Sequence, residues 1–219
     1  MGKIVNIVTL KHGTLYGSNY VNKMYNMIKR NITFPFRFYC VTDDHSELSS
    51  DITVVKLPDD DTIRGWWWKP YLFKTGLFKD GTNLYIDLDM VILKNIDEFI
   101  TYKPNKFLGL RNYLYLREGY EGHRSLASGM MRWENNTYNM IWDRLTRDRH
   151  LINSYHGDQD YIWHYHQHSI EFFPDDFTMS YKWDHIKDHK VYPNAKVLVF
   201  HGEPRPHQVS DQIVLEHWK

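Results

Sequence analysis

The sequence predicts an α/β domain in which helices flank a mostly parallel central sheet. Short runs rich in β-branched and aromatic residues alternate with a segment of helical periodicity in the N-terminal part of the chain. The connections between these segments are short, as they are in parallel α/β sheets. The 219 residues contain no internal repeat, low-complexity segment or Gly/Ser-rich linker, so we expect one compact domain spanning 1–219.

The N-terminal half, residues 1–93, carries the clearest pattern. Strands are predicted at 4–10, 36–42 and 52–57, because these runs are short, apolar and bounded by polar residues. A helix is predicted at 18–30, where apolar residues recur at helical spacing, and a second helix at 66–78. That second helix leads into a hydrophobic run at 83–93, which we interpret as one further strand.

The C-terminal half, residues 94–219, is less regular. Strands are predicted at 107–110, 128–133 and 197–200, helices at 139–147 and 158–164, and a polar aromatic loop at 113–124. Ligands of open α/β sheets bind at the carboxyl ends of the strands. We therefore expect a crevice between the two halves, at the ends of the N-terminal strands.

The composition argues against several classes of protein. Lys plus Arg and Asp plus Glu each number 27, so no net field attracts nucleic acid, and no nucleic-acid partner is expected. The lone Cys40 excludes an internal disulfide and suits a reducing compartment. No apolar run reaches the roughly 18 residues of a membrane span, and no secretory leader is evident. We expect a soluble, cytoplasmic protein without a transmembrane segment.

Two carboxylates, Asp87 and Asp89, interrupt the hydrophobic run at 83–93. In an extended chain, residues two apart point to the same side, so this pair would share one face and concentrate negative charge there. Such a pair calls for a cation, and a hard divalent metal is the obvious candidate. His201, just past the strand at 197–200, is the best third ligand, and an imidazole shifts the preference toward Mn²⁺ over Mg²⁺.

The run Trp66-Trp67-Trp68-Lys69 is the most unusual stretch in composition. Three adjacent indoles cannot share one helix face, so we expect most of them in the core and one in the crevice. Lys69 could contact a phosphate, although an ordinary solvated lysine is the simpler interpretation.

A second acidic group, Asp158-Gln159-Asp160, follows Gly157. Acidic residues in the first turn of a helix are favoured by the helix dipole alone. For chemistry, Asp158 could accept a proton from an acceptor hydroxyl, and Gln159 or Asp160 could hold that acceptor.

Taken together, these residues resemble a glycosyltransferase of the GT-A fold, a Rossmann-like fold, and are most similar to glycosyltransferase family 8 and its small bacterial or viral relatives. The segment from Tyr85 to Val91 resembles the metal-binding Asp-x-Asp strand of that family. The segment from Phe200 to His207 resembles its C-terminal metal and diphosphate segment. Uracil recognition is where the chain departs from the family, because Leu10-Lys11-His12 replaces the acidic base-binding residues.

The resemblance implies a role for each residue of the site. Asp87, Asp89 and His201 would bind the metal, Asp158, Gln159 and Asp160 would face the sugar and the acceptor, and the donor would be held by Thr9, Leu10, Tyr16, Lys69, Asp87, Leu88, Ser128, Gly129, Gly202 and Arg205. Thr9, Leu10 and Tyr16 would lie at the base and ribose. Arg205 would take the place of the lysine that grips the diphosphate.

The activity implied is metal-dependent transfer of a hexose from a nucleotide diphosphate sugar to a carbohydrate acceptor, with a UDP-sugar as the favoured donor. Two alternatives stay open. The run from Asp87 to Ile92 also fits the nucleophile motif of haloacid-dehalogenase-like phosphatases, in which Asp87 would attack phosphorus. The 8 Trp and 16 Tyr could instead serve a carbohydrate-binding protein without catalysis.

Overall fold

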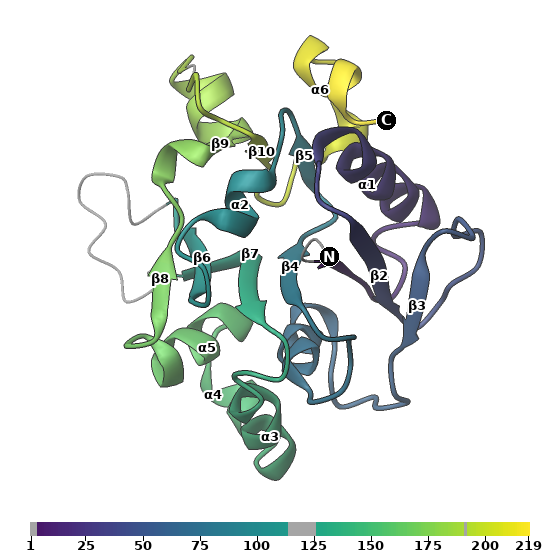
Figure 1. Cartoon of the computed structure of the whole chain (residues 1–219), viewed down its shortest axis with the longest axis vertical. Helices are drawn as coiled ribbons and strands as arrows, with labels where there is room; N and C mark the ends of the chain where they lie inside the picture. Colours follow the sequence, from purple (N-terminus) through teal and green to yellow (C-terminus); the bar gives the residue numbers. More distant parts are fainter. Residues whose placement is uncertain (1–3, 114–125, 191) are drawn as a thin grey trace.

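A seven-stranded sheet forms the centre of the molecule (Figure 1). The structure is a computed structural model that describes residues 4–113, 126–190 and 192–219. In spatial order, the strands of this sheet are β3 (Thr53–Lys56), β2 (Phe36–Thr42), β1 (Val5–Lys11), β4 (Thr82–Ile86), β7 (Leu126–Glu134), β6 (Phe107–Arg111) and β8 (Ile170–Phe172). Strands β1 to β4 pair in parallel, β7 runs antiparallel to β4 and β6, and β6 pairs in parallel with β8. The prediction of a mostly parallel α/β sheet is confirmed.

Both faces of the central strands are buried. In β1, Val5 and Ile7 pack into the core on one side of the sheet, and Val8 packs into the core on the other. Strand β4 repeats this alternation with Leu84 and Tyr85. A strand covered on both faces reads as a continuous apolar run, which is why the sequence indicated these strands clearly.

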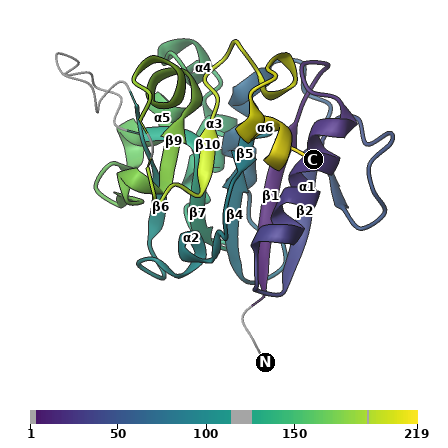
Figure 2. The same ribbon diagram turned by 90° about the horizontal axis from the view of Figure 1, so that it is seen from above.

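Each face of the sheet has its own covering layer (Figure 2). One face carries α1 (Ser18–Asn31), α2 (Asp97–Thr101), α6 (Gln212–His217) and a small sheet of β5 (Met90–Ile92), β10 (Val197–Val199) and β9 (Thr178–Ser180). The other face carries η1 (Gly65–Phe73), α3 (Met140–Arg147) and α5 (Asp158–His166). The remaining short elements are α4 (Leu151–Ser154), η2 (Asp175–Phe177), η3 (Tyr181–Lys187) and η4 (Pro206–Gln208).

Helix α1 shows why the N-terminal pattern was readable. Its buried residues recur at helical spacing on one face, and Lys29 and Arg30 lie in its last turn, where a cation interacts favourably with the helix dipole. The buried residues are Tyr20, Val21, Met24, Met27 and Ile28.

Two predicted elements were wrong in form. The helix expected at 66–78 is a 3₁₀ helix that ends at Phe73, with Pro70 inside it. Proline lacks the backbone N–H that an α-helix needs at that position, so the regular ladder of an α-helix is interrupted. The strand expected at 83–93 is divided into β4 and β5, which belong to different sheets.

The C-terminal half contains elements that the sequence did not indicate. Strands β8 and β9 have three residues each, and η3 is a π-type helix. Such short strands carry too few residues for a period-two pattern to be recognised. The polar loop predicted at 113–124 lies outside the described residues except for Tyr113. Among the described residues, no helix is both long and apolar enough to cross a bilayer.

Candidate active site

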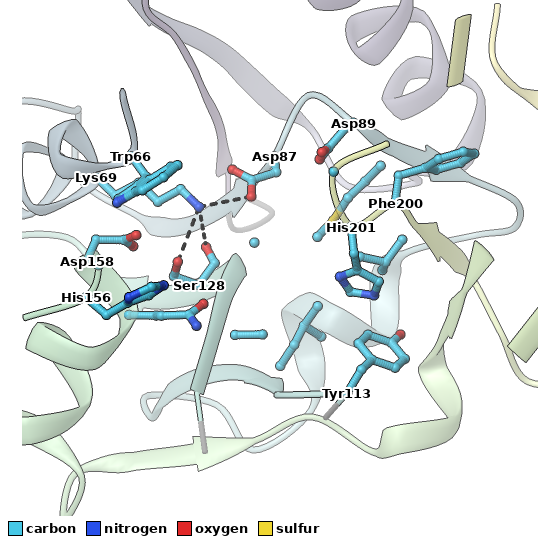
Figure 3. Close-up of a pocket in the computed structure, with 18 residues that line it drawn as sticks. Trp66, Lys69, Asp87, Asp89, Tyr113, Ser128, His156, Asp158, Phe200 and His201 are labelled. Carbon is cyan, nitrogen blue, oxygen red and sulfur yellow. Dashed lines mark hydrogen bonds and ion pairs between the residues drawn. The ribbon is translucent and has the colours of Figure 1, made fainter. Parts of the chain in front are cut away.

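A cleft of about 340 Å³ opens at the carboxyl end of β4, where the two sheets meet. It is lined by η1, the turn between β4 and β5, β7, the start of α5 and the segment after β10. Figure 3 shows Trp66, Lys69, His156 and Asp158 on one side of this cleft, and Asp89 and His201 on the other. The crevice at the strand ends is therefore present, and it brings together residues that are far apart in the sequence.

The Asp87–Asp89 segment is a turn, not extended chain. The backbone N–H of Met90 donates to the carbonyl of Asp87 at 3.2 Å, and Leu88 is buried in the core. The prediction that the two carboxylates share one face of a strand is thus wrong in its geometry. The turn nevertheless directs both side chains into the cleft, because the chain changes sheets between them.

Lys69 is the buried cation beside these acids. Its ammonium donates to Asp87 Oδ2 at 2.9 Å and to Ser128 Oγ at 3.2 Å. Burial alone would lower the pKa of Lys69, but the charges of Asp87 and Asp158 outweigh it and raise that pKa. Lys69 therefore stays charged, and it fixes Asp87 together with the hydroxyl of Tyr85, which donates to Asp87 Oδ1.

Asp89 lies in a different electrostatic environment from Asp87. Its carboxylate accepts a hydrogen bond from the hydroxyl of Tyr16 at 3.0 Å. Burial, reinforced by the charge of Asp87, raises the pKa of Asp89 to about 7. The raised pKa of Asp89 shows that the neighbouring side chains do not fully neutralise the negative charge around Asp87 and Asp89. A cation bound between these carboxylates would compensate that charge.

His201 lies on the same side of the cleft as Asp89 (Figure 3). Its Nε2 is buried without a hydrogen-bond partner, and its ring contacts Tyr113 with ring centroids 4.7 Å apart. Burial and the nearby charge of Lys182 lower the pKa of His201 to about 4, so the ring is neutral at physiological pH. A neutral imidazole with an orphaned nitrogen is the form in which histidine binds metals.

The donor set at this end fits a divalent metal in its chemistry. Asp87 and Asp89 supply carboxylate oxygens, and His201 supplies the unpartnered nitrogen, a combination typical of Mn²⁺. Across residues 4–113, 126–190 and 192–219, no three such side chains lie close enough to form a ready-made metal centre. The three predicted ligands share the cleft, and their role as ligands stays a prediction.

The start of α5 forms the opposite wall. Asp158 is buried at the first position of the helix, and its Oδ2 has no hydrogen-bond partner. Burial, opposed in part by the charge of Lys69, raises the pKa of Asp158. Gln159 also lines the cleft, whereas Asp160 is half-buried and not part of its lining.

Ser128 and Gly129 of β7 form the floor. The backbone N–H of Asp87 donates to the carbonyl of Gly129 at 2.8 Å. A Cβ placed on Gly129 would lie 2.6 Å from Met90 Cε and 3.2 Å from Asp87 Oδ2. The absence of a side chain at Gly129 therefore leaves room for the acidic turn to lie against β7.

The residues predicted to hold the nucleotide lie near Asp89 and His201 or in the sheet next to them. The hydroxyl of Thr9 donates to the carbonyl of Ile86 at 3.0 Å within the sheet, and Leu10 is half-buried in the core. The guanidinium of Arg205 lies 5.3 Å from the ring centroid of Tyr16 and 3.2 Å from Glu203. Gly202 lines the cleft. These roles in donor binding stay predictions.

The polar and aromatic residues that were not singled out from the sequence as site residues include Tyr85, Tyr113, His156 and, by number, Trp66. Tyr85 could have been found, because it is a tyrosine at the end of β4 only two residues before Asp87, to which its hydroxyl donates. Tyr113 and His156 carry no local signal, since their place depends on tertiary packing.

The fold is that of the GT-A glycosyltransferases. The chain aligns with the structure of an active-site mutant of LgtC with a TM-score of 0.69, 10% identity, and coverage of 96% of this chain and 93% of that one. It also matches the galactosyltransferase LgtC in complex with donor and acceptor sugar analogs, with a TM-score of 0.64, 12% identity and coverage of 92% and 88%. The glycosyltransferase GlyE of Streptococcus pneumoniae matches with a TM-score of 0.70, 14% identity and coverage of 96% and 59%.

At the sequence level, a scan against family models and a search of curated proteins both find no match. The GT-A fold predicted from the ordered motifs is thus confirmed by structure, while assignment to glycosyltransferase family 8 stays a prediction.

Proposed function

We propose that this protein is a metal-dependent glycosyltransferase that moves a hexose from a nucleotide diphosphate sugar, with a UDP-sugar as the favoured donor, to a carbohydrate acceptor. The observation that carries the proposal is the cleft itself. On a fold shared with glycosyltransferases, it brings together the Asp87–Asp89 turn, His201 on the side of Asp89, the buried Lys69 against Asp87, and the buried Asp158.

The chemistry of sugar transfer explains this arrangement. When the bond between the sugar and the diphosphate breaks, negative charge develops on the leaving nucleotide. A metal held by Asp87, Asp89 and His201 would supply Lewis-acid stabilisation of that charge. Arg205, next to this end of the cleft, would add a second positive group to the diphosphate.

Asp158 is the better candidate for handling the proton of the acceptor hydroxyl. Its raised pKa and its unpartnered Oδ2 suit a group that takes up a proton, and it lines the cleft while Asp160 does not. Lys69 would orient the donor sugar, because its ammonium already reaches the floor of the cleft at Ser128. In a retaining reaction the leaving phosphate would take the proton instead, and Asp158 would hold a sugar hydroxyl.

Calorimetry with UDP tests the proposal directly. We expect UDP to bind in the presence of Mn²⁺ and to bind much more weakly after chelation, because the diphosphate would otherwise face the uncompensated acidic turn. A panel of nucleotide sugars, screened for metal-dependent hydrolysis, then identifies the donor. Release of phosphate from a phosphomonoester, with an adduct trapped on Asp87, would favour the phosphatase alternative.

Replacement of Asp89 gives the first specific prediction. Asp89→Ala removes a carboxylate that faces the cleft and accepts a hydrogen bond from Tyr16, so the fold should persist while Mn²⁺-dependent UDP binding falls about 100-fold. The matched control is Glu216→Ala, which removes an exposed carboxylate of α6. Unchanged UDP affinity in Asp89→Ala would rule out the metal bridge.

A further inference from the structure

The three consecutive tryptophans of η1 have different environments. Trp67 and Trp68 are 7% and 1% exposed and pack in the core, whereas the side chain of Trp66 is 58% exposed. Trp66 nevertheless lines the cleft, on the same side as His156 (Figure 3). A large indole left in solvent at the rim of a polar cleft contributes little to the core, so its position points to a role in binding.

The backbone at the start of α5, on the same side of the cleft, makes room for this indole. A Cβ placed on Gly157 would lie 3.3 Å from Trp66 Nε1 and 3.7 Å from its Cδ1. Gly157 has φ −167°, extended backbone that any residue adopts, so its conformation does not require glycine. The missing side chain is therefore what allows the indole to lie against the start of α5.

The deeper part of the cleft is polar and closed. Lys69, Ser128 and Asp158 are all buried there, next to the acidic turn that would hold the diphosphate. A donor sugar tethered to that diphosphate reaches this floor first. An acceptor comes from solvent and meets the rim, where the exposed face of Trp66 and the imidazole of His156 lie. Flat aromatic faces with adjacent polar groups suit a sugar ring, which has C–H groups on one face and hydroxyls at its edge.

We propose that Trp66 is the stacking platform for a pyranose ring of the carbohydrate acceptor, and that Gly157, which has no side chain, leaves the room that the indole needs to take up its stacking position. This inference rests on the proposed function and adds the acceptor subsite to it. Trp66 is a specificity residue here, which contacts the acceptor but not the reacting phosphate.

The test compares acceptor and donor parameters in Trp66→Ala. The probes are the methyl β-pyranosides of glucose, galactose and N-acetylglucosamine, with the donor found by the nucleotide-sugar panel. We expect the acceptor KM of the best probe to rise about tenfold, because the variant loses one aromatic contact with the acceptor. The affinity for UDP and Mn²⁺ should stay the same. Trp66→Tyr should restore most of the acceptor affinity, because it keeps an aromatic face.

Leu215→Ala is the matched control, since Leu215 is also 58% exposed but lies on α6 outside the cleft lining. Tryptophan fluorescence adds a direct readout. Titration with the best pyranoside should change the emission of the wild-type protein but not that of Trp66→Phe.

A double-mutant cycle tests the part assigned to Gly157. Gly157→Ala pushes the indole by a few tenths of an ångström and should raise the acceptor KM several-fold, but it should have no further effect in the Trp66→Ala background. A full additional loss in that background would mean that Gly157→Ala acts through Asp158, and would remove Gly157 from the proposal.

Three results would overturn the platform. The first is an unchanged acceptor KM in Trp66→Ala. The second is a rise in the donor KM in place of the acceptor KM, which would place the donor sugar on the indole. The third is that the wild-type protein binds none of the pyranosides at millimolar concentration. Failure of the proposed function is a separate outcome, because it appears as loss of metal-dependent UDP binding and donor hydrolysis, which need no acceptor.

Discussion

At the residue scale, the two acids of the turn are held by different partners. Asp87 is held by the buried ammonium of Lys69 and the hydroxyl of Tyr85, whereas Asp89 accepts from the hydroxyl of Tyr16. The ion pair with Lys69 fixes the position of Asp87. Asp89, held by a neutral donor, is the member of the pair that is more available to another cation.

Asp158 leads to a prediction about pH. Its pKa is raised in the folded protein, so at neutral pH the buried charge reduces the free energy of unfolding. As the pH falls, the folded state takes up this proton first, and the penalty disappears by the unfolded pKa of about 3.9. We therefore expect Asp158→Asn to be more stable than the wild type at pH 7, with an advantage that shrinks toward pH 4, in urea unfolding measured across that range.

The same substitution should lower the transfer activity, since the amide cannot accept the acceptor proton. Asp143→Asn, which removes a half-buried carboxylate of α3 outside the cleft lining, is the control and should leave the transfer activity unchanged. A stability difference that is constant with pH would show that burial does not raise the pKa of Asp158.

The acids and the lysine of the cleft could be proposed from sequence because each lies in a local pattern. Asp87 and Asp89 interrupt an apolar run, and Lys69 follows three tryptophans. The contact between Tyr16 and Asp89 joins residues 73 apart in the chain. No local pattern contains such a pair, because it forms only when β1 and β4 lie side by side in the sheet.

At the element scale, Gly129 of β7 determines how closely the Asp87–Asp89 turn can approach that strand. Gly129→Ala would place a methyl group 2.6 Å from Met90 Cε and 3.2 Å from Asp87 Oδ2. We expect the protein to lose about 1–3 kcal/mol of unfolding free energy through overpacking and to bind UDP and Mn²⁺ more weakly, as Asp87 is displaced. Chemical denaturation and calorimetry measure the two effects separately.

A second-site change separates the two contacts. Met90→Leu removes the methyl group at Met90 Cε, so the double variant Gly129→Ala/Met90→Leu should recover much of the stability but not the affinity for UDP. Recovery of both would mean that Gly129 matters only for core packing.

The helices and strands were predicted with unequal success for a physical reason. Helix α1 buries one apolar face, which leaves a helical period in the sequence, and strands β1, β2 and β4 are buried on both faces, which leaves continuous apolar runs. At 66–78, the length and spacing indicated an α-helix, but Pro70 changed the hydrogen bonding. Between β4 and β5, Asp87 and Asp89 interrupt the apolar run, but the residues on both sides are equally apolar, so the sequence did not show that the chain changes sheets there.

At the scale of the whole molecule, the order of motifs along the chain predicted the GT-A fold better than any one motif did. An Asp-x-Asp alone occurs in many proteins, but here it precedes the acidic start of α5, and the histidine follows β10. The register of the small sheet completes the site: Met90 lies opposite Val199, so Asp89 and the segment leading to His201 meet at the same edge. Strand register of this kind depends on tertiary pairing, which the sequence alone does not specify.

The division of 83–93 between two sheets has a mechanical consequence. Asp87 follows β4 of the large sheet, whereas Asp89 precedes β5 of the small sheet, and His201 follows β10 of the small sheet. A cation shared by these three side chains would act as a crosslink between two otherwise separate hydrogen-bonded ladders. We expect Mn²⁺ with UDP to slow amide hydrogen exchange across β5 and β10 more than across β2 and β3, which lie far from that crosslink. Equal slowing of all four strands would show instead that ligand binding tightens the domain as a single body.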